Sequence, residues 1–291
     1  MYLHTTDAHC HADFSRYADF SGLAFGIDLC VDACFAGDWE GLKKFSAFPI
    51  KKAYGIHPDL RASEFDDIAF VESELFATFL PALQQYLISA DAVGETGLDE
   101  NIQNRIPMEL QKKLFKAQLD LAEKFNLPVI VHCVGMWGAV FEILKAWANA
   151  SKLSTAERLE GLKGRRFLMH AAKCSPEMVR EFEKIGGRFS FGLRELNCER
   201  GAKCAQSVSP DRIMVESDSA TSRKIMDETV RKLAEIRNVD DMELSDTLYA
   251  NFMEFYSKPP ERKLAHLFLS VNLLEPSARQ DAVRIYLSMR V

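Results

Sequence analysis

The chain has 291 residues, of which 47% are hydrophobic and 27% charged, and its formal net charge at pH 7 is −6. This composition is typical of a globular protein, and the length suits one large domain or two small ones. The acidic balance argues against a long basic groove for duplex nucleic acid, but it allows a strand end held locally by metal ions.

Two features bear on where the protein works. No apolar run reaches the roughly 20 residues of a membrane helix, and the opening "MYLHTTDAHCH" has no basic segment followed by an apolar one. The seven cysteines are an odd number without C-x-x-C spacing, which favours a reducing compartment. We therefore expect a cytoplasmic protein that makes no membrane contact and needs no obligate protein partner.

Short β-branched or apolar runs alternate with longer amphipathic segments along the chain. The predicted strands are 5–11, 26–35, 50–58, 91–98, 128–133, 165–171, 186–192 and 212–219. The predicted helices include 64–88, 108–125, 137–149, 175–185, 222–236 and 241–256. Strands that alternate with helices indicate βαβ units and a parallel sheet, so the fold class is α/β.

Eight such strands favour a (β/α)8 TIM barrel. A doubly wound open sheet has a similar pattern, but it would place a glycine-rich phosphate loop after an early strand, and the sequence has none there. We expect the barrel to span residues 1–258. Residues 259–291, which include the apolar stretch "LAHLFLSVNLLEP", are expected to form a C-terminal helical extension packed on it.

Ionisable residues gather at the predicted strand ends, where such barrels place their active sites. His9 and His11 are two residues apart in a strand, so their side chains point to one face. The other ionisable residues at strand ends are His57, Glu95, His132, His170 and Asp218. A single histidine after an apolar run is more often a core residue, but a buried carboxylate without a partner is costly. Imidazoles and carboxylates around one cavity together indicate a divalent metal site.

The order and wording of these motifs resemble a known family. The segments are "DAHCH", "YGIHP", "VGETGLD", "LPVIVHC", "VESDS" and "YANFMEFY". Over about residues 6–257 they resemble the TatD-type metal-dependent hydrolases of the amidohydrolase superfamily. Glu95 occupies the place where related families carry a metal-bridging lysine, as in the TatD-type group. The resemblance implies phosphodiester hydrolysis, most often as an exonuclease-like deoxyribonuclease.

The resemblance also implies a division of roles. Two divalent ions (Zn, Mn or Mg) would be held by His9, His11 and Asp218 on one side and by His132 and His170 on the other, with Glu95 between them. Metal-activated water would attack the substrate, and Asp218 would take its proton. His57 and Lys173 are candidate substrate contacts, and Arg194 is a further cation that could meet a phosphate. For Lys173 and Arg194, solvated loop charges are the simpler alternative.

Several positions depart from the family pattern. Val134 replaces an arginine two residues after the fifth-strand histidine, and Ala172 lies where the family commonly has phenylalanine. Ala220 replaces a proline, and Glu100 follows the GLD element in place of an aromatic residue. These changes affect the pocket wall, so an amidohydrolase that cleaves a small amide, lactone or ester remains an alternative. A non-catalytic binding barrel would predict a missing ligand residue, and none is missing.

Overall fold

The computed structural model describes residues 4–11, 27–44, 50–60, 68–150, 166–218 and 221–257. The described residues as far as Tyr256 belong to one compact unit. The predicted C-terminal extension, 259–291, lies outside the described residues. Among the described helices, none combines the length and the apolar character that crossing a bilayer requires.

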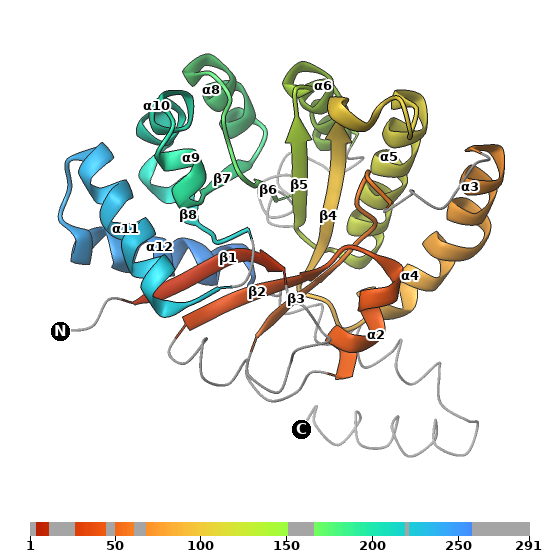
Figure 1. Ribbon diagram of the computed structural model, residues 1–291, viewed down its shortest axis with the longest axis horizontal. Coiled ribbons are helices and arrows are strands. Elements are labelled where there is room, and N and C mark those ends of the chain that lie inside the picture. Colours follow the sequence, from red (N-terminus) through yellow and green to blue (C-terminus); the bar gives the residue numbers. More distant parts are fainter. Residues whose placement is uncertain are drawn as a thin grey trace, which may run out of the picture. The chain divides into compact units, whose positions relative to one another are not determined.

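A parallel sheet whose strands follow one another in chain order forms the centre of this unit (Figure 1). Its eight strands are β1 (Thr5–His11), β2 (Ile27–Ala33), β3 (Lys51–Tyr54), β4 (Ala92–Asp99), β5 (Val129–Val134), β6 (Phe167–Met169), β7 (Gly187–Phe191) and β8 (Ile213–Val215). Beyond β8, the amide of Asp218 donates to the carbonyl of His9 at 3.1 Å, which links the two edges of the sheet. The predicted (β/α)8 barrel is confirmed.

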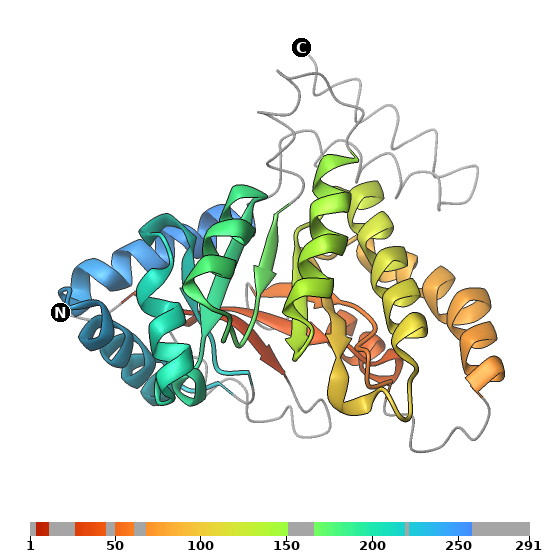
Figure 2. The same ribbon diagram turned by 90° about the horizontal axis from the view of Figure 1, so that it is seen from above.

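Helices follow the strands and lie on the outside of the sheet (Figure 2). They are α2 (Ala36–Lys44), α3 (Ile68–Glu74), α4 (Leu80–Leu87), α5 (Met108–Phe125), α6 (Trp137–Asn149), α8 (Pro176–Lys184), α9 (Leu193–Leu196), α10 (Glu199–Ser207), α11 (Arg223–Arg237) and α12 (Asp241–Phe255). A π-helix, η2 (Leu75–Phe79), joins α3 to α4, and short 3₁₀ turns are η3 (Glu100–Ile102) and η4 (Pro210–Arg212). The sequence analysis did not predict α2, α9 and α10; α9 has only four residues, too few to display a helical period.

The strands carry side chains in layers inside the barrel. One residue from each of seven strands forms an apolar layer: Ala8, Cys30, Ala53, Ala92, Ile130, Leu168 and Met214. Phe252 and Phe255 of α12 and the adjacent Tyr256 pack against this layer. Two residues further along a strand the side chain points the same way. The layer above the apolar one therefore receives Asp32, His132 and His170.

Two strands contain a β-bulge at the level of this upper layer. The pairing of β1 with β2 shifts register between Asp7 and Cys10, and that of β4 with β5 shifts between Val93 and Thr96. A bulge adds one residue to a strand and changes the direction of the side chains that follow. The bulges contain His9 and Glu95, so Glu95 turns inward although strict alternation from Ala92 would turn it outward.

Tyr256 supplies a test of how α12 is attached to the barrel. Its hydroxyl donates to the carbonyl of Ala8 at 2.6 Å in a fully buried position. We expect Tyr256→Phe to lower the free energy of unfolding by about 1 to 3 kcal/mol, because a buried carbonyl loses its donor. Urea denaturation measures the loss, and Tyr249→Phe on the half-buried face of α12 is the matched control. Equal stability of the two variants would contradict this role.

Candidate metal centre

Glu95 lies at the centre of the cluster, and its two carboxylate oxygens face different histidines. Oε1 is 2.6 Å from Nδ1 of His132, 2.7 Å from Nε2 of His170 and 3.5 Å from Nε2 of His57. Oε2 is 3.2 Å from Nε2 of His11 and 3.6 Å from Nε2 of His9. One buried carboxylate is therefore shared by two groups of nitrogen atoms.

The ring of His9 is fixed from behind by a carboxylate of the next strand. Nδ1 of His9 lies 2.6 Å from Oδ2 of Asp32, and neither side chain is exposed to solvent. With Nδ1 directed at Asp32, Nε2 points into the cluster, and loss of its proton to a metal ion would give a lone pair there. That Nε2 atom is buried and has no hydrogen-bond partner. It lies 3.6 Å from both Glu95 Oε2 and Asp218 Oδ1.

His132 and His57 are oriented by groups in the loops above the strands. Nε2 of His132 is 3.2 Å from Oδ2 of Asp99, which leaves Nδ1 to face Glu95. His57 differs, because its Nδ1 accepts the backbone N–H of Asp59 at 3.0 Å. The neutral His57 ring therefore carries its proton on Nε2, where it can donate to Glu95 or to a bound substrate.

The segment after β8 contributes two carboxylates. Oδ1 of Asp218 faces the cluster, at 3.6 Å from Nε2 of His9 and 3.8 Å from Nε2 of His11. Glu216 is fully buried, accepts the amide of Ala171 at 2.8 Å, and lies 3.6 Å from Nδ1 of His170. Ala171 and Asp218 both take left-handed backbone conformations, with φ of 46° and 53°. Such strained residues are frequent at functional sites.

The charges in this cluster depend on one another. Burial alone would raise the pKa of Glu95, but His170, His57 and His132 hold it well below its usual range. Burial lowers the pKa of His170, whereas Glu95 raises it, with a net result of about 10. The pKa values of His9 and His132 are also raised against the effect of burial, chiefly by Asp32 and Glu95 respectively.

This donor set fits divalent metal ions. There are four groups of three residues whose possible ligand atoms lie, within each group, no more than 4.8 Å apart. Together these groups contain His9, His11, Cys34, His57, Glu95, His132, His170 and Asp218. Imidazole and carboxylate ligands suit Zn²⁺ and Mn²⁺, and carboxylates also suit Mg²⁺. The buried Nε2 atom of His9, aimed at two carboxylates, has the environment of a metal-ligand atom.

All six residues predicted as metal ligands lie together in this cluster, and His57 joins them. Nζ of Lys173 lies 3.5 Å from Oε1 of Glu195, a residue of α9 that is not one of the possible ligands. Residues that the sequence analysis missed are Asp32, Cys34, Asp99 and Glu216. Asp32 and Cys34 lie near the carboxyl end of the second predicted strand, 26–35, so the same strand-end rule that selected the histidines would have selected them.

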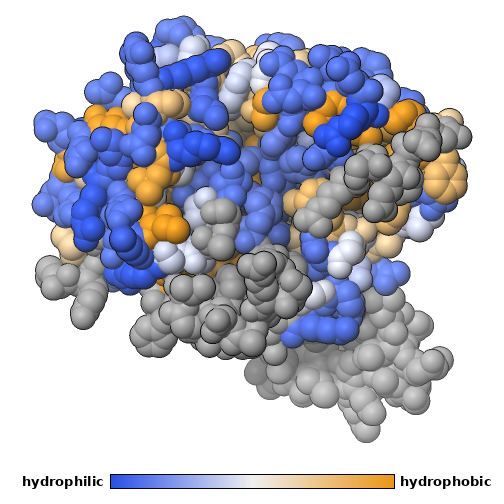
Figure 3. Space-filling model, in the orientation of Figure 1, coloured by the Kyte–Doolittle hydropathy of each residue, from blue (hydrophilic) through white to orange (hydrophobic). Residues whose placement is uncertain are grey.

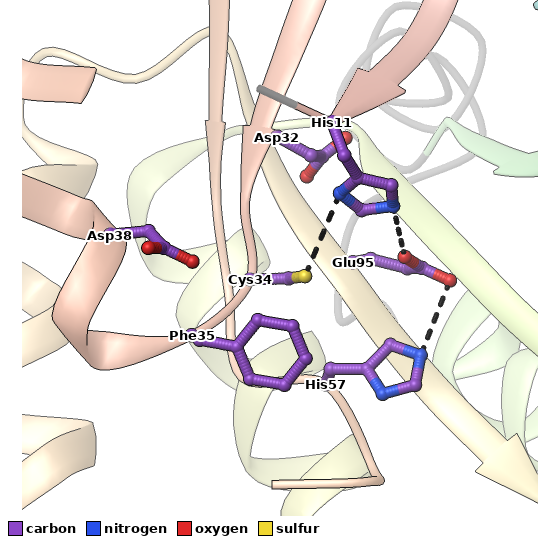
Figure 4. Close-up of a pocket in the computed structure, with 7 residues that line it drawn as sticks. All are labelled: His11, Asp32, Cys34, Phe35, Asp38, His57 and Glu95. Carbon is purple, nitrogen blue, oxygen red and sulfur yellow. Dashed lines mark hydrogen bonds and ion pairs between the residues drawn. The ribbon is translucent and has the colours of Figure 1, made fainter. Parts of the chain in front are cut away.

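A pocket opens beside the cluster (Figure 4). It is lined by His11, Asp32, Cys34, Phe35, Asp38, His57 and Glu95. The rings of His11 and His57 approach Glu95 from opposite sides of its carboxylate, and Cys34 lies near His11. These lining residues offer polar and ionisable groups to a substrate, with Phe35 as an apolar wall. Hydrophilic side chains also cover most of the coloured surface on the side of the molecule drawn in Figure 3.

Comparison with known proteins identifies the family. A model described as TatD related DNase matches residues 6–257. The chain belongs to this family.

At 30% identity or more, the similarity to the following two members is local. The uncharacterized metal-dependent hydrolase YabD of Bacillus subtilis is 30% identical over 129 residues, or 44% of this chain and 45% of that protein. The 3'-5' ssDNA/RNA exonuclease TatD of a Rahnella species is 43% identical over 133 residues, or 44% of each chain. Both of these relatives are thus matched over less than half of their own length.

A solved structure supports the fold over the whole barrel. The crystal structure of YJJV, a TatD homologue from Escherichia coli, superposes with a TM-score of 0.69 at 20% identity. It covers 89% of this chain and 100% of that one. The family resemblance drawn from the motifs is confirmed, and this TatD-family chain is a metal-dependent hydrolase.

The contact between Asp32 and His9 predicts an effect on metal affinity. Asp32→Asn keeps the size of the side chain but removes the charge that holds the His9 ring, so metal affinity should fall about 10- to 100-fold. Metal titration followed by calorimetry measures the loss. Asp28→Asn, at the other end of β2, is the matched control and should bind metal as the unchanged protein does. Unaltered affinity in Asp32→Asn would exclude an orienting role.

The raised histidine pKa values predict that metal uptake depends on pH. Because the pKa of His170 is raised to about 10, its ring is protonated at neutral pH until a metal displaces the proton. Metal binding should therefore release protons, and the affinity should increase as the pH rises from 6 to 8. Calorimetry in two buffers with different ionisation enthalpies measures the released protons. Identical heats in both buffers would contradict this protonation state.

Proposed function

We propose that this TatD-family hydrolase is a metal-dependent phosphodiesterase that degrades single-stranded nucleic acid from an end. The observation that carries the proposal is the placement of Glu95, whose two oxygens face two separate groups of possible ligands. Oε2 faces His9 and His11, and Oε1 faces His132 and His170. Two-metal sites that cleave phosphodiesters hold their ions roughly 3.5 to 4 Å apart, and a carboxylate that offers one oxygen to each ion would suit this spacing.

Two divalent ions fit this arrangement. His9, His11 and Asp218 would hold one ion, His132 and His170 would hold the other, and Glu95 would contact both. Zn, Mn and Mg are all compatible with these ligands. When bound, such ions polarise a phosphoryl oxygen and lower the pKa of water, which supplies a nucleophile at neutral pH.

The side chains of the cluster around Glu95 have complementary roles. His9 and His170 hold the pKa of Asp218 below its usual range, although burial would raise it, so Asp218 is ionised and can accept the proton of the attacking water. His57 carries its proton on Nε2 and can donate it to a phosphate oxygen. Asp32 and Asp99 keep the rings of His9 and His132 in the tautomers that this arrangement requires.

The charge of the whole chain limits how nucleic acid binds. With a net charge of −6, the protein has no general attraction for a polyanion. Phosphate affinity must come from the metal ions and from a few cations beside them, so binding should involve roughly one to three phosphates. Such local binding suits a strand end better than an extended duplex. The exonuclease name of the Rahnella relative agrees with this substrate.

Replacement of Glu95 tests the bridging role. Glu95→Gln keeps the side-chain size but removes the charge that offsets two cations, so both metal sites should weaken together and hydrolysis should fall by orders of magnitude. Metal titration and rate measurements are made on the same preparation. Glu100→Gln is the matched control, since Glu100 is an exposed residue directly after β4, the strand that carries Glu95. Two sites of unchanged affinity would make Glu95 a structural carboxylate only.

The substrate class is tested directly with metal-loaded protein. We expect single-stranded DNA to be shortened from an end faster than duplex DNA, with a shallow dependence on salt concentration. A chelator should abolish the reaction, and the variant His9→Ala, His11→Ala should remain inactive when metal is restored. Cleavage of small esters, lactones or amides with single-stranded DNA left intact would overturn the nuclease proposal in favour of the amidohydrolase alternative.

A further inference from the structure

Two cationic side chains, one after β6 and one after β7, contact the same buried carboxylate beside the candidate metal centre. Glu195 follows β7 in α9, and only 1% of its side chain is exposed. Its Oε1 accepts from Nε of Arg194 at 2.7 Å and lies 3.5 Å from Nζ of Lys173, in the loop after β6. The cations themselves are accessible, because 68% of Arg194 and 40% of Lys173 are exposed.

The backbone holds Glu195 firmly in this position. A Cβ atom placed on Gly201 of α10 would lie 2.1 Å from the carbonyl oxygen of Glu195, so α10 packs directly against this residue. A Cβ atom on Gly192 would lie 3.2 Å from Oε2 of Glu195. Close packing on both sides fixes where the carboxylate points, and through it where the two flexible cationic side chains end.

Arg194 connects this group to the metal centre. Its Nη2 donates to Oδ2 of Asp218 at 3.1 Å, while Oδ1 of the same carboxylate faces His9 and His11. The guanidinium thus contacts one of the candidate metal ligands directly. Within the described part of the chain, no residue accepts a hydrogen bond from Nη1, and a guanidinium edge of this kind matches the oxygens of a phosphate.

We propose that Glu195 is a positioning residue that holds Arg194 and Lys173 as a subsite for a second phosphate, next to the one that is cleaved. This inference rests on the proposed function. Glu195 offsets only one of these two positive charges, and Asp218, the second carboxylate that accepts from Arg194, turns its other oxygen toward the candidate ligands His9 and His11. Its ligand is a phosphate attached one nucleotide away from the scissile bond, either a terminal monophosphate or the next internal phosphodiester.

Substrates that differ by one phosphate test the subsite. A thymidine dinucleotide has only the scissile phosphodiester, its 5'- and 3'-phosphorylated forms add a terminal phosphate on either side, and the trinucleotide adds an internal one. For the unchanged protein, we expect KM to be about tenfold lower for at least one of the longer substrates than for the dinucleotide, as one charge-assisted contact provides. Which of them is favoured identifies the source and side of the second phosphate.

Variants then assign this preference to the subsite. Arg194→Ala, Lys173→Ala and Glu195→Gln should each raise KM for the favoured substrate several-fold and reduce its advantage over the dinucleotide. Arg194→Lys should keep part of this advantage over the dinucleotide, because it preserves the positive charge. Combining Glu195→Gln with Arg194→Ala should add little to the single effects, because both remove the same contact. Glu199→Gln is the matched control, since Glu199 is 82% exposed on α10 and pairs only with Lys203 among the described residues.

The outcomes separate the two proposals. If the unchanged protein cleaves no phosphodiester, the proposed function fails. If it cleaves the dinucleotide but gains nothing from a second phosphate, or if the variants keep the full gain, the subsite is overturned. A purely structural role for Glu195 would lower kcat on every substrate by the same factor. If Glu195→Gln does not fold, the variants at exposed Arg194 and Lys173 still decide the question.

Discussion

A charge buried at the centre of the barrel, the carboxylate of Glu95, is the constraint on which the rest of the site depends. Only 2% of this side chain is exposed, and an ionised group in that position is stable only if opposite charges surround it. His9 of β1, His132 of β5 and His170 at the end of β6, whose pKa values are all raised, supply those charges in the metal-free state. The same nitrogen atoms are ligands for cations, so the arrangement that stabilises Glu95 without metal also prepares its binding site.

The general position of this site follows from the sequence, because parallel strands deliver their carboxyl ends to one face of a barrel. The histidines at the ends of apolar runs can therefore be grouped from the sequence alone. The inward direction of Glu95 could not be derived from alternation, since it depends on a bulge in β4. A bulge has no reliable signature in "DAVGETGL", and the family resemblance, rather than periodicity, placed Glu95 at the centre.

The contacts that orient the histidines were also beyond the sequence. Asp32 and His9 are 23 residues apart, and Asp99 and His132 are 33 apart, so the pairings depend on the register between neighbouring strands. The helix α9, with four residues, is too short for a periodic pattern, yet it places Arg194 and Glu195. Lys173 and Arg194 were recognised as cations near the site, but their common partner could not be.

The positive charges near the site lie on one side of it. Val134, the last residue of β5, brings no charge to the end of the strand that carries His132. Arg194 and Lys173 lie instead beyond β7 and β6, on the side of Asp218. An acidic protein repels nucleic acid except where a few cations are held in place. Fixing them through a buried carboxylate concentrates the attraction beside the reactive centre, and this favours a short anionic substrate or a strand end over a long duplex.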